Sequence, residues 1–209
     1  PDWQNPACLH IGRENPRASL IPFLCEESAL VGERAFSGAY RLLNGVWDFY
    51  YAPTGAAPER FQDVDYDFSD PGWAELPVPS NWQMQGYDRN QYCNVRYPWE
   101  GEEDICPPNA PTKHNPVGCY LKRFHVNQSV LSKRVVLCFE GVESAFYLYV
   151  NGERVGYSES SFNRAEFDIS RYLVEGSNVI GVDNSAYAAA TLDNVTWKFV
   201  ANGSYYKIQ

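Results

Sequence analysis

The sequence has few basic residues and no block of them. Its 17 Lys and Arg are outnumbered by 26 Asp and Glu, so the 209-residue chain carries a formal net charge of −9. Phosphate backbones and anionic lipid headgroups repel such a chain. No apolar run approaches the roughly 20 residues that cross a bilayer. These absences argue against nucleic acid and against a membrane surface as partners.

The start of the sequence also lacks a feature. The sequence starts with Pro1-Asp2-Trp3-Gln4, which is neither the basic segment nor the apolar segment found at the start of a secretory signal. We therefore expect a cytoplasmic protein. A signal cleaved from a precursor would leave no trace, so a secreted or periplasmic location stays open.

Closely spaced cysteines are missing as well. The spacing of about two to four residues that zinc sites and redox pairs use does not occur. The six thiols belong to Cys8, Cys25, Cys93, Cys106, Cys119 and Cys138. They are too sparse for a small disulfide scaffold, so we expect free, mostly buried thiols. Pairing among the three from Cys93 to Cys119 stays open.

Motifs of catalysis and ion binding are incomplete. Asp63, Asp65 and Asp67 resemble the opening of a calcium loop, but the Gly and Glu that such a loop needs further on are absent. Gly156–Ser160 is one glycine short of a nucleophile elbow. No pair of carboxylates stands in a frame distinctive of glycoside hydrolysis. The residues themselves therefore offer no catalytic constellation.

What the sequence does contain favours strands joined by turns. Aromatic residues make up 15 %, and 15 Gly and 14 Pro are spread along the chain. Trp47, Phe49 and Tyr51 would share one face of a strand. Other strands are expected at 120–126, at 135–139 (buried on both faces), and at 145–150, 153–158 and 178–182, with Asn151-Gly152 turning the hairpin between 150 and 153.

The remaining pattern completes the expected architecture. The segment 167–173 could form one helical turn capped by Asp168, and Asn202-Gly203 suggests a last hairpin that leads into 205–208. Residues 1–39 read as an extended arm, and 40–209 as the main domain. We predict an all-β fold, an antiparallel β-sandwich. An excursion over 76–116 carries seven prolines, and a loop of that length points to a functional site.

Two blocks of this excursion resemble a known family. Val78–Asp88 (VPSNWQMQGYD) and Tyr92–Pro98 (YCNVRYP) are similar to the signature of the amino-terminal sugar-binding domain of β-galactosidases in glycoside hydrolase family two. Further similar blocks follow the family's order between Trp3 and Val182: 3–6, 115–120, 139–146, 151–158 and 166–169.

The resemblance implies a jelly-roll, galactose-binding-domain-like sandwich at the start of a longer enzyme that hydrolyses terminal β-D-galactosides. In that family the catalytic glutamates lie in a later (β/α)₈ barrel. This chain is therefore expected to be inactive alone, with a β-galactoside and that barrel as partners. The parent family uses sodium and magnesium, but we expect no cofactor in this chain.

The resemblance also implies site residues. The family's substrate-contacting asparagine falls on Asn94, whose amide can both donate to and accept from a sugar hydroxyl; the alternative is that Asn94 only closes a turn beside Pro98. After Val182 the last 25 or so residues diverge from the family. Alignment on Trp197 puts Val195 where an Asp contacts galactose and sodium, and valine can supply neither contact.

Two alternative functions stay open. The first is a free-standing carbohydrate-binding module, in which exposed aromatic side chains of Trp82, Tyr97 or Trp99 stack on a sugar. The second is a purely structural interface domain, with a β-glucuronidase or a β-mannosidase as other possible parents. Because fold alone does not fix function, the choice depends on the site.

Overall fold

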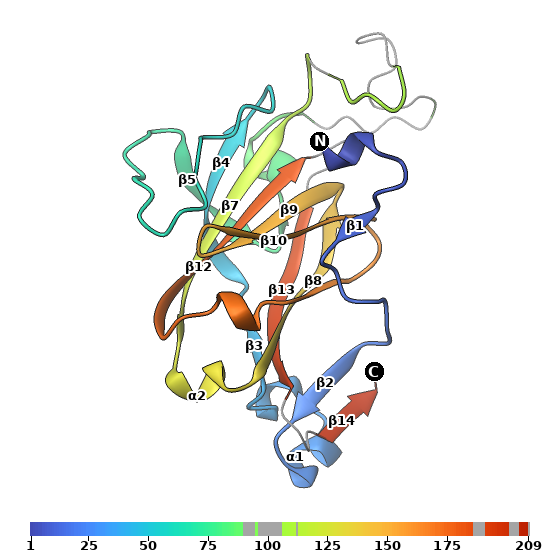
Figure 1. The fold of residues 1–209 in the computed structure, drawn as a ribbon, viewed down its shortest axis with the longest axis vertical. Helices are drawn as coiled ribbons and strands as arrows, with labels where there is room; N and C mark the ends of the chain where they lie inside the picture. The colour runs from blue at the N-terminus through green and yellow to red at the C-terminus, as the bar shows by residue number, and fades with distance from the viewer. Residues whose placement is uncertain (90–94, 96–105, 112, 186–190, 201–204, 209) are drawn as a thin grey trace.

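Two antiparallel sheets pack face to face in the computed structural model, which describes residues 1–89, 95, 106–111, 113–185, 191–200 and 205–208 (Figure 1). The larger sheet has the strand order β1 (His10–Ile11), β10 (Glu153–Glu159), β9 (Ala145–Val150), β12 (Gly176–Ser185), β7 (Val117–Val126), β4 (Gly45–Ala52) and β5 (Trp73–Val78). Every described pairing in it is antiparallel.

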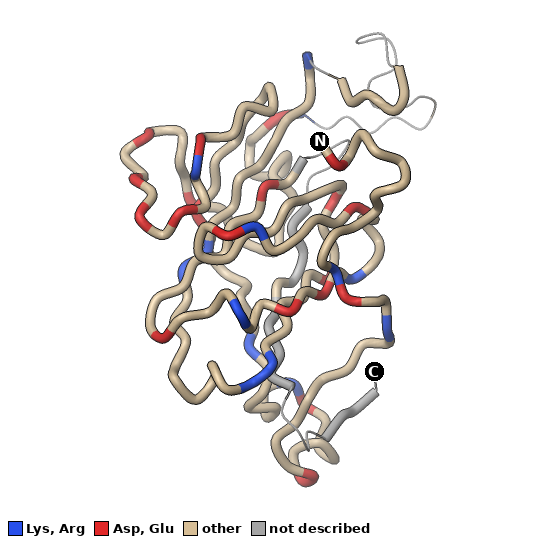
Figure 2. The backbone as a smooth tube through the Cα atoms, in the orientation of Figure 1, with Lys and Arg blue, Asp and Glu red and all other residues tan. Residues whose placement is uncertain are grey.

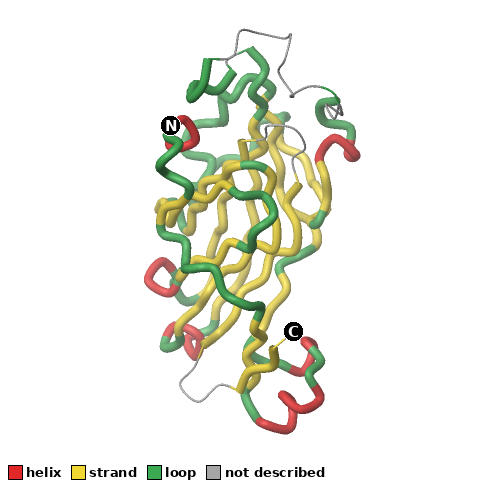
Figure 3. Tube along the Cα trace, turned by 90° about the vertical axis from the view of Figure 1, so that its right-hand side faces the viewer, coloured by secondary structure: helices red, strands yellow, loops and turns green. Residues whose placement is uncertain are grey.

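The smaller sheet has the order β11 (Ala165–Asp168), β8 (Arg134–Glu143), β13 (Thr191–Val200) and β3 (Tyr40–Leu42), with β6 (Ser80–Asn81) also pairing with β13. The described helices are short and lie at the ends and margins of the strands (Figure 3). They are α1 (Glu26–Val31), α2 (Gln128–Leu131) and the 3₁₀ turns η1 (Asp2–Gln4), η2 (Arg34–Phe36), η3 (Trp82–Gln85) and η4 (Ser170–Tyr172). The all-β sandwich prediction is confirmed.

The core lies between the two sheets and is rich in aromatic side chains. Trp47 and Phe49 of β4 and Tyr120 of β7 are buried and face the smaller sheet's Phe139 and Phe167. Each residue from Val135 to Phe139 is fully buried. This confirms the prediction of a central strand without a solvated face.

The hairpin between β9 and β10 turns at Asn151-Gly152, as predicted. Both residues have positive φ, 51° and 83°, which is the conformation that a two-residue hairpin of this kind requires. The side chain of Asn151 then reaches across to the next strand: its Nδ2 donates to Oδ1 of Asn178 at 2.8 Å, and its Oδ1 accepts from the backbone N–H of Val179 at 2.8 Å.

The acidic segment 53–72 covers the outer face of the larger sheet. Figure 2 shows its acidic residues along the loop beside β4 and β5. Below these charges, Phe61, Phe68 and Trp73 pack together and cover Leu121, which is buried on the outer face of β7. The loop therefore covers a second, smaller hydrophobic core and is not only a solvated acidic turn.

The helical turn predicted within 167–173 is present as η4, and Asp168 Oδ1 accepts from the N–H of Ser170 at 3.0 Å, but Phe167 and Asp168 themselves belong to strand β11. The prediction of a last hairpin is wrong. The strand after Asn202-Gly203, β14 (Tyr205–Ile208), pairs with β2 (Leu20–Phe23) and not with β13. It therefore forms a separate two-stranded sheet with the arm.

The prediction of mostly buried cysteines is also wrong. Of the five that the structure describes, all are free thiols, but only Cys119 and Cys138 are buried. Cys8 is half-buried, and Cys25 and Cys106 are exposed. Cys93 lies outside the described residues. Cys119 packs in the second core, where burial raises the pKa of its thiol.

The first residues run along one side of the sandwich from the upper to the lower end in Figure 1. Strand β1 pairs with β10 of the larger sheet, and Arg13 forms a backbone bridge to Phe167 of the smaller one. Further on, Ile21 and Phe23 are buried. No helix within the described residues is long and apolar enough to span a membrane.

Candidate functional site

The excursion leaves the sandwich through a short, well-defined segment. After β5, strand β6 leads into the 3₁₀ turn η3, whose first N–H groups are capped by Asn81: its Oδ1 accepts from the N–H of Gln83 at 3.0 Å. Gly86, with a φ of 94°, ends the turn in a left-handed conformation that glycine adopts without strain. The block that resembles the family signature is thus the base of the excursion.

Trp82 does not have the exposure that sugar stacking requires, so that expectation is wrong. Its side chain is 0 % exposed and packs against Phe49 and Tyr51, with ring centroids 5.8 and 5.7 Å apart. The reason lies at Gly118, whose missing side chain leaves a slot that the indole fills. Nε1 of Trp82 has no hydrogen-bond partner among the described residues. Trp82 is therefore a core residue that anchors the excursion.

The three other candidate site residues, Asn94, Tyr97 and Trp99, lie outside the described residues. The structure does define where the excursion begins and ends. Asp88 at its start and His114 near its end are close together, with 3.8 Å between Oδ1 and Nε2. The carboxyl group of Asp88 is nearly buried, and the backbone of Asp88 has a positive φ of 60°.

Tyr51 of β4 completes this polar group under the excursion. Its hydroxyl donates to the carboxylate of Asp88. Burial, together with the negative charge of Asp88, raises the pKa of Tyr51 well above its usual range. The sequence reasoning missed this group, because its three members are far apart along the chain and carry no common motif.

The position aligned with the family's sodium-binding Asp is apolar and buried. Val195 is 0 % exposed, and its backbone N–H donates to Oδ1 of Asn44 at 3.0 Å. An aliphatic side chain in the core offers no oxygen ligand, and sodium requires oxygen ligands as other hard cations do. Within the described residues, no group of His, Cys, Asp or Glu is arranged to hold a metal ion. The described residues do not fit the family's ion at this position.

A further, partly buried carboxyl group lies on the outer face of the larger sheet. Asp183 of β12 stands opposite Cys119 of β7. Burial raises the pKa of Asp183 to about 6. At the end of β8, burial also raises the pKa of Glu143, whose backbone pairs with β13 beside the base of the excursion.

The fold and the excursion define an antiparallel β-sandwich with its candidate binding segment at one end. The chain belongs to the glycosyl hydrolases of family 2: residues 40–205 match the profile of the sugar binding domain of that family.

Curated relatives agree with this assignment. The chain is 46 % identical over 186 residues to a β-galactosidase of Priestia megaterium. The aligned region covers 88 % of this chain and 18 % of the relative. It is 41 % identical over 160 residues to a β-galactosidase of Clostridium acetobutylicum, covering 75 % of this chain and 18 % of the relative. The chain thus spans less than a fifth of the length of these proteins.

Solved structures share the fold at lower identity. A β-glucuronidase of Bacteroides uniformis superposes with a TM-score of 0.56 at 18 % identity, over 78 % of this chain and 18 % of the other. A β-glucuronidase of Bifidobacterium dentium, complexed with coumarin-3-O-glucuronide, gives 0.51 at 23 % identity, over 70 % of this chain and 20 % of the other. At this level the likeness concerns the sandwich alone.

Proposed function

We propose that this chain is the non-catalytic sugar-binding domain of a β-galactosidase and that its excursion forms part of the substrate pocket. The observation that supports this most is the match of residues 40–205 to the family's sugar binding domain, together with relatives that are β-galactosidases. The catalytic acid and nucleophile are supplied by a barrel domain elsewhere in the enzyme. The sandwich holds the sugar-side loops in place for that barrel.

Within this proposal Asn94 contacts the substrate. An amide that donates to one sugar hydroxyl and accepts from another discriminates against sugars that lack either group. Asp88, His114 and Tyr51 hold the two ends of the excursion together, and Trp82 fixes its first turn to the core. The proposal assigns no ion to Val195.

A domain exchange tests this function directly. The sugar-binding domain of the Priestia megaterium β-galactosidase is replaced by this chain, and hydrolysis of a chromogenic β-galactoside is measured. We expect an active chimera in which Asn94→Ala lowers kcat/KM by about tenfold or more, as the loss of a hydrogen bond to substrate does. Asn109→Ala, an exposed asparagine in the same excursion, is the matched control and should change little.

Two results would contradict the proposal. One is a folded chimera that hydrolyses no β-galactoside while the unmodified relative does. The other is an active chimera that Asn94→Ala leaves unchanged. The chain alone should release no product from the same substrate.

The alternative of a free-standing module has its own measurement. Calorimetric titration of the chain with galactose, lactose and longer β-linked oligosaccharides should then give binding that Tyr97→Ala or Trp99→Ala abolishes. The burial of Trp82 removes one of the three aromatic side chains on which that alternative relied.

A further inference from the structure

The first part of the arm makes few hydrophobic contacts with the described part of the sandwich: only the half-buried Trp3 and Cys8 pack against a cluster that contains Tyr147 and Tyr157. None of residues 1–20 is buried, whereas Ile21 and Phe23, which follow directly, are 2 % and 0 % exposed. Since burial of apolar surface is the main source of stability in folded chains, residues 2–17 must be held largely by polar contacts. We refer to residues 2–17 as the strap.

Backbone pairing holds the strap to one edge of each sheet. His10 and Ile11 pair with Ser158 and Tyr157 of β10, and the N–H of Glu159 donates to the carbonyl of Leu9 at 3.1 Å. Three residues further on, the N–H of Glu14 donates to the carbonyl of Glu166 in β11 at 2.8 Å. The strap therefore spans the opening between the two sheets.

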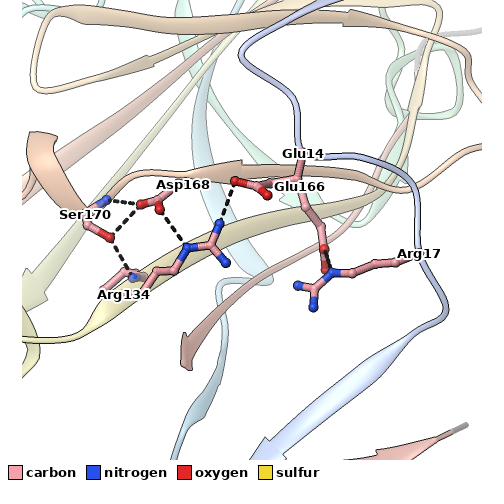
Figure 4. Close-up of polar contacts among 7 residues, drawn as sticks. Glu14, Arg17, Arg134, Glu166, Asp168 and Ser170 are labelled. Atoms are coloured by element: carbon pink, nitrogen blue, oxygen red, sulfur yellow. Dashed lines mark hydrogen bonds and ion pairs between the residues drawn. The ribbon is translucent and has the colours of Figure 1, made fainter. Parts of the chain in front are cut away.

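Ion pairs fix the lower end of the strap (Figure 4). Nη2 of Arg134 donates to Oε1 of Glu14 at 2.6 Å, and its Nε donates to Oδ2 of Asp168 at 2.8 Å. Nε of Arg17 donates to Oε2 of Glu166 at 2.7 Å. We call these five residues the latch.

The order of charges in the latch favours one register of the strap against the sandwich. On the strap an acidic residue precedes a basic one, Glu14 and then Arg17, and each meets the opposite charge on the sandwich. A shift that placed Glu14 against Glu166 would bring two carboxylates together, which is unfavourable. At the upper end Asp2 forms a further pair with Arg154, and Trp3 packs on Tyr147 with ring centroids 5.5 Å apart.

We propose that residues 2–17 are a detachable strap, which leaves the sandwich as one unit while the chain from Ile21 onward stays folded, and that the latch sets how often it leaves. The Arg134–Glu14 pair is at least a third exposed on both sides and contributes modestly, whereas Glu166 is nearly buried, so its pair with the exposed Arg17 contributes more. The strap therefore opens at a lower free energy than the core, as segments with few buried contacts do.

Native-state hydrogen exchange of the full chain, read by mass spectrometry, tests the proposal. The variant Glu14→Gln/Arg17→Gln removes both strap charges of the latch; Gln matches Glu in size but is shorter than Arg. We expect exchange to rise about tenfold throughout residues 2–17 and at the amide of Glu159, with no change in β8 or in residues 21–39. Glu59→Gln/Arg60→Gln makes the same changes in the loop 53–72 and should leave strap exchange as it is.

Three outcomes would overturn the proposal. Exchange in the strap that the latch variant does not alter would show that the ion pairs do not hold it. Acceleration confined to residues 13–17 would show that the strap does not move as one unit. An equal rise in β8 would show that the strap opens only when the whole domain unfolds.

Discussion

The indole ring of Trp82 packs over Gly118, so closely that a Cβ atom at position 118 would lie 2.6 Å from Cε3 of that ring. The same Cβ would lie 2.9 Å from Cε2 of Phe49. Gly118 is at the start of β7, where the excursion returns to the sandwich, and Trp82 is at its base. This contact therefore joins the two ends of the excursion through the core.

From this contact we predict that Gly118→Ala destabilises the domain by about 1–3 kcal/mol, because an added methyl group overpacks a filled core. Urea unfolding measures the change. In a Trp82→Leu background, which is itself destabilised by loss of the ring, the same Gly118→Ala change should cost less because the slot is no longer full. Equal costs in both backgrounds would show that the two residues do not compete for this space.

A second prediction concerns Asn151 at the hairpin turn. Its side chain donates to the carbonyl of Tyr172 and to Oδ1 of Asn178 and accepts from the N–H of Val179. We expect Asn151→Gly to cost about 1–3 kcal/mol from lost hydrogen bonds. Asn151→Ala should cost about 1 kcal/mol more, because φ is positive there.

Thermal or urea unfolding compares these variants with Asn127→Ala. Asn127 is exposed and makes no capping hydrogen bond with its side chain, so its replacement should cost little. If Asn151→Gly cost no more than Asn127→Ala, the side-chain hydrogen bonds of Asn151 would not contribute to stability.

The third prediction is a pH dependence that arises from Asp183. Burial raises its pKa from 3.8 to about 6, so the folded chain binds a proton there that the unfolded chain has lost. The stability from Asp183 is therefore present below pH 4 and is lost as the pH rises through 6. Asp183→Asn should raise the free energy of unfolding at pH 7 by about 1–3 kcal/mol and have little effect at pH 4.

Urea unfolding at pH 4, 5, 6 and 7 tests this prediction. Asp65→Asn, an exposed residue in the loop 53–72, makes the same change in charge and is the control. A gain from Asp183→Asn that is equal at all four pH values would contradict a titration of Asp183.

The strands were predictable where the signal is local. Alternation along 46–51, the continuous apolar run 135–139 and the turn at Asn151-Gly152 each act over a few residues, and the structure contains them all. The pairing of β14 with β2 joins segments near opposite ends of the chain. No local pattern specifies such a pairing, so the hairpin predicted from Asn202-Gly203 was wrong.

The candidate site was predictable only in part, for the same reason. The motif around Trp82 located the base of the excursion, but the burial of Trp82 depends on Gly118, which lies far along the chain. Asp88 and His114 meet only because the excursion returns beside its start. The role of Asn94 rests on family resemblance and stays a prediction.

The path of the strap also bears on aggregation. A bare sheet edge presents unpaired N–H and C=O groups to other molecules and can template intermolecular β-structure. Here the strap covers β10 and β11, the opposite edge of the larger sheet carries Pro77, and β3 is only three residues long. A truncation that removes the strap would therefore expose unpaired backbone groups of β10 and β11, on one edge of each sheet, at once.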